Sequence, residues 1–306
     1  MTTRLRAAGA AVIFLLITAL SLHAQTPSPS GASAQAADQP PGPPAPPTTH
    51  EIELNITNLP TTRSLKRHQG YFRLTHRFAA DLRRGSFGQL AENLFTIDQG
   101  AIIGLEYRFG ITSNLQAGVH RSMLSKTIQF FGKYDGWRQG DRMPVSISLI
   151  GSIEGLNNLQ DNHQPAIVAS ISRAVGNSLM LYATPGFVAN TRAADFLSGH
   201  DDHDHDLPGE ETEDEHASHE HTMFLGVGGR ARIRPTFYVT GEFTPRLAGH
   251  DPGRGAWGFS LEKMTKGGGH TLQLNFTNSF GTTFGQLARG GSEHDIYLGF
   301  NITRKF

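Results

Sequence analysis

One stretch in the second half of the chain concentrates side chains that could bind a metal ion. Between residues 200 and 221 it holds six histidines and ten carboxylates, and no lysine or arginine. Imidazole and carboxylate are the ligands that Zn²⁺, Ni²⁺ and Cu²⁺ accept where thiolate is absent, and the chain has no cysteine. The ligands we expect are His200, His203, His205, His216, His219, His221, Asp201, Asp202, Asp204 and Asp206.

The alternative is that this stretch is a solvated acidic loop that keeps the surface hydrophilic. It lacks the apolar residues needed to fold by itself, so any metal would be held without a preformed cage. We therefore expect no required cofactor, and at most loosely bound Zn, Ni or Cu ions.

Charged residues also recur at every second position of otherwise apolar segments. Arg230, Arg232 and Arg234 alternate with Ala231 and Ile233. Further charges in the same kind of position are Glu106, Arg108 and Glu242. If these segments are strands, the charges share a face that is turned away from lipid, because a charge on the lipid face costs about 2–4 kcal/mol at mid-depth. They either line a pore or pair across the interior and close it.

Evidence for catalysis is limited to one pair of side chains. His120 and Ser122 lie two residues apart, on one face of a predicted strand. Nucleophilic catalysis requires a base within hydrogen-bond reach and a third, orienting group, and the sequence indicates no such group. We expect no enzyme activity.

The elements that carry these residues are predicted to be strands, because apolar side chains recur with a period of two. In the last segment, Ile296, Leu298, Phe300 and Ile302 share one face, since successive strand residues point to opposite sides. Twelve such segments are expected: 70–78, 98–109, 114–122, 125–134, 144–153, 164–174, 178–189, 222–233, 236–245, 256–264, 270–278 and 293–306.

Three features favour a membrane barrel over a soluble sandwich. The predicted strands are long enough for a tilted bilayer crossing. Short connections alternate with long ones, as in outer-membrane barrels. The chain also ends on an aromatic residue, Phe306, which closes an amphipathic strand. The predicted fold is all-β, an antiparallel transmembrane β-barrel of about 12 strands.

The remaining segments indicate export. Residues 1–24 have a basic start, an apolar run and a small-residue site at Ala24, as in a signal peptide. Residues 25–60 are expected to form a Pro/Ala-rich periplasmic linker and lead-in, in which the alternating run 51–56 is either an extra strand or a periplasmic segment. The barrel is expected over 61–306, with the His/Asp/Glu-rich loop at 195–221 outside the cell.

Several short motifs resemble a known family. They are His76-Arg77-Phe78, Leu94-Phe95-Thr96-Ile97-Asp98, Gly104-Leu105-Glu106-Tyr107-Arg108-Phe109-Gly110 and Lys133-Tyr134. Their pattern resembles an uncharacterised family of bacterial outer-membrane-type β-barrels known only as a domain of unknown function. In that pattern the tyrosine of the second strand is usually followed directly by glycine, whereas here Arg108-Phe109 intervenes. The resemblance implies a barrel and no particular activity.

The functional expectation is a channel or transport-related pore in the outer membrane of a Gram-negative-type bacterium. A surface barrel that binds Zn, Ni or Cu through its histidine-rich loop is the first alternative, and a structural barrel that supports a partner complex is the second. Expected partners are outer-membrane lipid and the barrel-assembly machinery, through the C-terminal strand. A formal net charge of zero gives no basic surface for nucleic acid.

Overall fold

The computed structural model describes residues 51–98, 100–140, 142–191, 221–249 and 254–306. The strands are β1 (Gly70–Asp81), β2 (Ala101–Gly110), β3 (Leu115–Ser122), β4 (Thr127–Trp137), β5 (Ser146–Gly155), β6 (Asp161–Val175), β7 (Leu179–Val188), β8 (Thr222–Arg234), β9 (Phe237–Thr244), β10 (Arg246–Ala248), β11 (Ala256–Met264), β12 (His270–Thr277) and β13 (Tyr297–Lys305). Short helices are α2 (Phe87–Glu92), α3 (Leu156–Leu159) and α4 (Phe284–Ala288), with 3-10 turns at Leu94–Thr96 and Leu124–Lys126.

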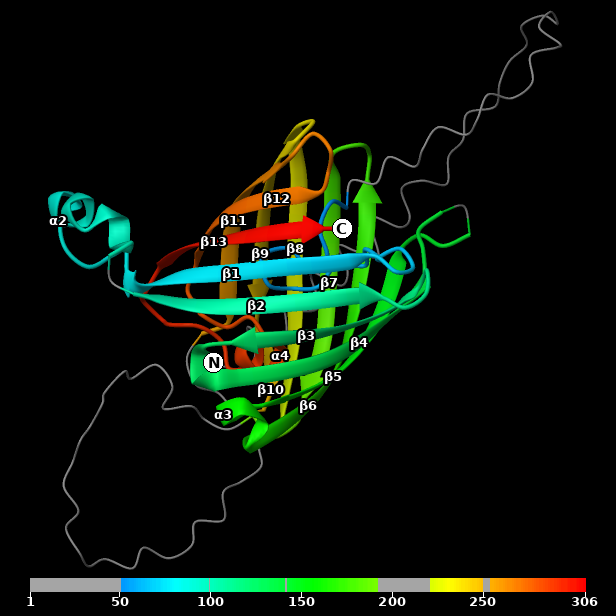
Figure 1. Cartoon of the computed structure of the whole chain (residues 1–306), viewed down its shortest axis with the longest axis horizontal. Coiled ribbons are helices and arrows are strands. Elements are labelled where there is room, and N and C mark those ends of the chain that lie inside the picture. Colours follow the sequence, from blue (N-terminus) through cyan, green and yellow to red (C-terminus); the bar gives the residue numbers. More distant parts are fainter. Residues whose placement is uncertain (1–50, 99, 141, 192–220, 250–253) are drawn as a thin grey trace, which may run out of the picture. The chain divides into compact units, whose positions relative to one another are not determined.

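Twelve of these strands form a closed antiparallel barrel (Figure 1). Neighbours along the chain pair with each other, β1 pairs with β13, and the pairing of β8 with β9 completes the ring. The strand β10 is a short addition that pairs with the start of β8. The predicted twelve-strand barrel is thus confirmed. A closed ring of this kind leaves no unpaired strand edge.

The two ends of the barrel differ. At one end, called here the short-turn end, the connections are 111–114, 138–145, 176–178, 235–236 and 265–269, and both the start of β1 and the C-terminus lie there. The long-loop end carries the remaining connections, including 82–100 and 278–296. The strand β4 continues to Trp137, so the turn that follows it is shorter than the sequence indicated.

Side chains on the barrel have the distribution of a membrane protein. On β2, Leu105, Tyr107 and Phe109 are exposed on the outer face, whereas Glu106 and Arg108 are buried on the inner one. On β12, Leu272 and Leu274 are exposed, and Gln273 and Asn275 are buried. An apolar exterior and a polar interior are the opposite of a soluble fold and match a barrel in lipid. Within the described residues, none of the helices is long and apolar enough to cross a bilayer.

Residues 51–65 lie inside the barrel, which corrects the expected boundary at residue 60. The alternating run at its start is neither an additional barrel strand nor a segment outside the barrel. It is one arm of a narrow hairpin, in which Asn55 pairs with Pro60 and both faces of the arm are buried. Because the lumen surrounds the hairpin, polar and apolar residues of the run are buried alike. The compact unit accordingly begins at Glu51.

Candidate functional site in the barrel lumen

The hairpin 51–65 is held together by its own backbone. The Ile56 amide donates to the Leu59 carbonyl at 2.8 Å, and the Thr61 amide donates to the Leu54 carbonyl at 2.9 Å. The Asn55 side chain donates to the carbonyl of Asn58 at 2.9 Å, across the turn. A two-stranded hairpin alone is marginally stable in water, so the surrounding barrel must supply the remaining stabilisation.

The tip of the hairpin encloses the carboxylate of Glu242 on β9. The amides of Thr57, Asn58 and Leu59 donate to this carboxylate at distances of 3.0, 2.9 and 3.1 Å. Successive backbone N–H groups that converge in this way form an anion-binding concavity. Glu242 is 7% exposed, and these charge-assisted hydrogen bonds satisfy a carboxylate that burial would otherwise disfavour.

Four arginines surround the carbonyl and amide oxygens of the hairpin. Arg73 donates to the Thr57 carbonyl at 3.3 Å and Arg77 to the Asn58 side chain at 3.0 Å. Both oxygens of Asn55 are also bound: Arg108 donates to its side-chain oxygen at 2.5 Å, and Arg230 donates to its carbonyl at 2.7 Å. These cations come from β1, β2 and β8, so the hairpin joins distant parts of the wall.

Three of these arginines pair with carboxylates of the wall. Arg73 pairs with Glu106 at 3.0 Å, and Arg108 pairs with the same carboxylate. Arg230 pairs with Glu262 at 2.8 Å. These side chains are almost fully buried, where a charge without a partner would cost several kcal/mol. The interior is therefore a balanced polar network rather than a surface of one sign.

Two further ion pairs fix the base of the hairpin at the short-turn end. Lys305 pairs with Glu53 at 2.7 Å, and Thr271 donates to the same carboxylate at 2.6 Å. Burial alone would raise the pKa of Glu53, but the Lys305 ammonium and the Thr271 hydroxyl outweigh burial and lower this pKa. On the other side, Lys133 donates to the Arg63 carbonyl at 2.7 Å and pairs with Asp135.

From the long-loop end, residues 278–292 fold into the lumen and bring α4 with them. Phe284 and Ala288 pack against a buried apolar cluster on the inner wall that includes Ile150, Val168 and Phe224. Leu287 shares a second cluster with Ile56 and Leu59 of the hairpin. The sequence predicted a long outer loop here, and part of it instead lines the interior. The lumen is thus filled from both ends by elements that meet near its middle.

The predicted interior charges fall into two groups. Glu106, Arg108, Arg230 and Glu242 are buried in the network described above. Arg232 and Arg234 lie at the short-turn end, where Arg232 donates to the Asn177 carbonyl at 2.7 Å and Arg234 is exposed. These two arginines take no part in the network around the hairpin.

The predicted metal ligands lie outside the described residues except His221. Its ring is exposed, accepts the Asn190 amide at 3.3 Å and lies 5.7 Å from the ring of Phe187. In the described part of the chain, no three histidine or carboxylate side chains gather as a metal site would require. The proposed ligand set therefore remains a prediction from the sequence.

His120 and Ser122 both face the interior but do not contact each other as a catalytic pair would. The His120 ring lies 3.1 Å from the Thr282 hydroxyl and 3.3 Å from a Glu106 oxygen. The Ser122 hydroxyl accepts the Leu124 amide at 3.3 Å. The histidine thus connects the loop 278–292 to the wall, which is a structural use of this residue.

Sequence reasoning missed several interior residues. Arg73 and Arg77 alternate with apolar residues on β1, and the same parity that identified Glu106 would have found them. Lys133, Glu154 and Glu262 follow the same rule on β4, β5 and β11. The partners of these charges could not be found, because no local pattern shows that residues 51–65 fold into the barrel.

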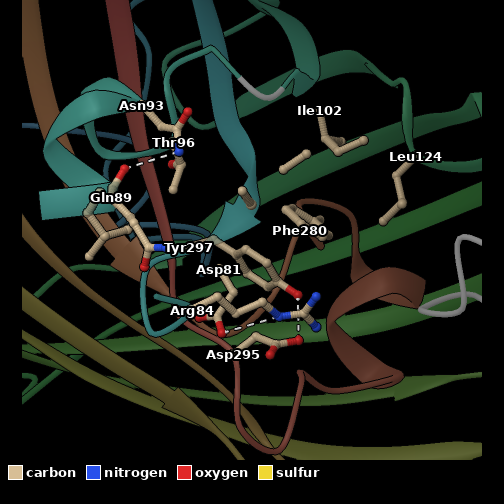
Figure 2. A pocket seen from close by; sticks show the side chains of 13 residues that line it. Asp81, Arg84, Gln89, Asn93, Thr96, Ile102, Leu124, Phe280, Asp295 and Tyr297 are labelled. Atoms are coloured by element: carbon tan, nitrogen blue, oxygen red, sulfur yellow. Dashed lines mark hydrogen bonds and ion pairs between the residues drawn. The ribbon is translucent and has the colours of Figure 1, made fainter. Parts of the chain in front are cut away.

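A cavity of about 550 Å³ lies at the long-loop end, between the loop 82–98 and the barrel (Figure 2). Its wall includes Asp81, Asp295 and the ring pair of Phe280 and Tyr297, whose centroids are 4.0 Å apart. The Tyr297 hydroxyl donates to Asp295 at 3.0 Å. Residues of α2 cover the opposite side.

The match to a protein family agrees with this architecture. A family model described as "Membrane bound beta barrel domain (DUF5777)" matches residues 53–306, and the chain belongs to this family. No curated protein matches the chain. Among solved structures, a KdgM porin is 9% identical, with 78% of this chain and 99% of that chain covered and a TM-score of 0.45. A NanC porin is also 9% identical, with 77% of this chain and 98% of that chain covered and a TM-score of 0.47. The COG4313 outer membrane channel from Pseudomonas putida F1 is 12% identical, with 80% of this chain and 98% of that chain covered and a TM-score of 0.45.

Proposed function

We propose that this protein is a channel of the outer membrane of a Gram-negative-type bacterium, and that the hairpin 51–65 closes it in the conformation described here. The observation that carries the proposal is the way the hairpin is held. Its tip and flanks contact the wall through hydrogen bonds to Glu242, Arg73, Arg77 and Arg230. Water molecules can take over these hydrogen bonds when the hairpin leaves. A barrel built only for support would need no polar interior around a segment of this kind.

Removal of the hairpin and of the inserted loop 278–292 would leave a hydrated, charged lumen. The arginines and their carboxylate partners would remain on the wall, and a polar interior of this kind conducts ions in open barrels. The wall carries both cations and anions, so the charge network favours small hydrophilic solutes over a single ion type.

A reversible lock on the hairpin tests this proposal. The hydroxyls of Thr57 and Ser260 lie 2.6 Å apart, and the chain has no cysteine of its own. Thr57→Cys together with Ser260→Cys should allow a disulfide that fixes the hairpin to β11. In planar bilayers, the oxidised variant should show no opening events, and reduction should restore them.

A matched control separates the lock from the loss of the two hydroxyls. The double variant Thr57→Ala with Ser260→Ala removes the same hydrogen bond without a cross-link, and it should open at least as often as the natural chain. A variant without residues 51–65, in which a short glycine–serine linker also replaces residues 279–291, should conduct continuously. If that deletion variant inserts into the bilayer but remains silent, the barrel is structural and the channel proposal fails.

A further inference from the structure

The long-loop end carries one short sequence twice. Residues 86–91 read Ser-Phe-Gly-Gln-Leu-Ala, and residues 283–288 read Thr-Phe-Gly-Gln-Leu-Ala. Each copy forms a helix, α2 or α4, and each begins with the same reciprocal capping box between its hydroxyl residue and its glutamine. The connections 82–100 and 278–296 that carry them are also equal in length.

The two copies stand in opposite surroundings. Every residue of α4 is buried in the lumen, whereas no residue of α2 is buried. Phe284 is 8% exposed and its counterpart Phe87 is 74% exposed. In Figure 1, α2 extends away from the end of β1, outside the ring of strands. The apolar side chains of α2 are therefore not covered by a wall, whereas those of α4 are.

The wall that holds α4 is called here the helix niche, and it consists of Ile150, Glu154, Gln164, Val168 and Phe224. It contacts α4 through groups that both copies of the sequence share. The Thr283 hydroxyl donates to Glu154 at 2.8 Å, and the Gly285 amide donates to the same carboxylate at 3.0 Å. The phenylalanine and the last alanine of the copy fill the apolar part.

The glycine of the repeated sequence is required in only one of its two surroundings. A Cβ at Gly285 would lie 2.0 Å from the Gln164 amide oxygen and 2.4 Å from a Glu154 oxygen. A Cβ at Gly88 would meet only the Ser86 hydroxyl, at 3.9 Å. Glycine inside an exposed helix costs about 1 kcal/mol relative to alanine. The exposed helix thus carries a costly residue that its present position does not need, whereas in the helix niche a Cβ there would force Gln164 and Glu154 to shift.

We propose that the helix niche is a binding site for this six-residue segment and that it accepts α2 in place of α4. The two loops leave the barrel from β1 and β12, which are separated only by β13, or about 10 Å at ordinary strand spacing. Extended chain from Asp81 to Phe87 spans roughly 20 Å, similar to the span from Thr277 to Phe284. Both helices therefore have comparable reach.

Charge explains why α4 is the resident. Arg289 follows α4 and acts on Glu154 as an opposite charge. Glu92, the last residue of α2, occupies the matching position in the other copy and would bring a like charge to the same carboxylate. Whichever of the two helices lies outside the helix niche exposes its apolar side chains at the long-loop end. Exchange would also dismantle the cavity of Figure 2, since α2 contributes Gln89 and Leu90 to its wall.

Pairs of introduced cysteines test the exchange in the full-length protein in detergent. Leu287 shares a buried cluster with Leu59, so Leu59→Cys with Leu287→Cys should cross-link with a short thiol reagent. Leu59→Cys with Leu90→Cys should cross-link several-fold less. Adding Gly285→Ala, which evicts α4, should raise the second cross-link several-fold, and adding Gly88→Ala as well should abolish the gain.

Two controls keep the result interpretable. Leu59→Cys with Leu247→Cys measures nonspecific reach, because Leu247 is an exposed residue of another connection at the same end. Phe284→Ser provides a second way to evict α4 if Gly285→Ala does not assemble, and heat-modifiable migration verifies the fold. If residues 59 and 90 cross-link no better than residues 59 and 247 in both evicted backgrounds, α2 does not enter the helix niche and the inference is overturned.

Discussion

At the residue scale, Glu242 shows what strand parity reveals and what it leaves hidden. Alternation along β9 places this carboxylate on the polar face, and the structure buries it there. Its partners are three amides more than 180 residues earlier in the chain. No period within a strand contains that information, because it depends on where a separate segment folds. The sequence therefore predicts the facing of a charge and not its partner.

The hydrogen bonds to Glu242 should contribute measurably to holding the hairpin. In Glu242→Gln the three amides would face a neutral acceptor, and a charge-assisted hydrogen bond is stronger than a neutral one by roughly 1–2 kcal/mol. We expect about 2 kcal/mol of lost stabilisation, or about a 30-fold faster exchange of the amides of residues 57–59. Hydrogen–deuterium exchange with mass spectrometry measures this rate.

The control for that prediction is Glu293→Gln. Glu293 pairs with Arg254 at 2.8 Å, but both side chains are exposed, and exposed ion pairs contribute at most about 1 kcal/mol. Exchange of the hairpin amides should be unchanged in this variant. Equal exchange in the natural chain and in Glu242→Gln would mean that the other contacts of the hairpin, and not this carboxylate, retain it.

At the element scale, the strands were predictable and the two lumen elements were not. Each strand has one apolar and one polar face, which a period of two displays directly. The hairpin 51–65 has no lipid-facing side, so its alternation at 51–56 resembled a strand of the wall. The helix α4 is only five residues long, and its glycine-rich surroundings predicted a loop. The capping pair Thr283 and Gln286, and the repeat of its sequence at 86–91, are the signals that could have identified it.

The C-terminal strand β13 gives a prediction about assembly. The amide and the carbonyl of Phe306 both bond to Gly70, at 3.1 and 2.8 Å, so this residue extends the pairing of β13 with β1. Its ring is exposed on the outer face near Tyr107. Deletion of Phe306 should lower the heat-modifiable, assembled fraction in membranes, whereas Phe306→Tyr should retain it. Full assembly of the deletion variant would show that the assembly machinery does not read this residue.

The histidine-rich loop can be tested apart from the barrel. A variant without residues 200–220 keeps His221 and both flanking strands, and should therefore fold. The natural protein should bind Zn²⁺ with roughly micromolar affinity, because a segment without a preformed site must be ordered on binding. Binding should weaken as pH falls through about 6.5, where imidazole gains a proton. Calorimetric Zn²⁺ titration of both proteins measures the difference, and identical titrations would remove the loop from consideration.

At the scale of the whole molecule, the barrel is asymmetric along its axis. The hairpin 51–65 enters from the short-turn end, where Lys305 and Lys133 hold its base. The loop 278–292 enters from the opposite end and meets the hairpin through Leu287. Each end thus has its own closing element, and a solute would have to displace both. This arrangement makes the orientation of the barrel in the membrane relevant to how it opens.

The orientation follows from parity and can be measured on intact cells. An even number of strands places the two ends of the barrel chain on one side, and in outer-membrane barrels this is the periplasmic side with its short turns. The short turn 265–269 should therefore face the periplasm, and the connection between β7 and β8 should face the exterior. An epitope tag at residue 207 should be labelled by antibody without permeabilisation, whereas a tag at residue 267 should be labelled only after it. Both tagged proteins should migrate as heat-modifiable bands, which verifies that the tags leave the barrel folded. Labelling of residue 267 on intact cells, with residue 207 protected, would reverse the orientation and place the hairpin entrance at the cell surface.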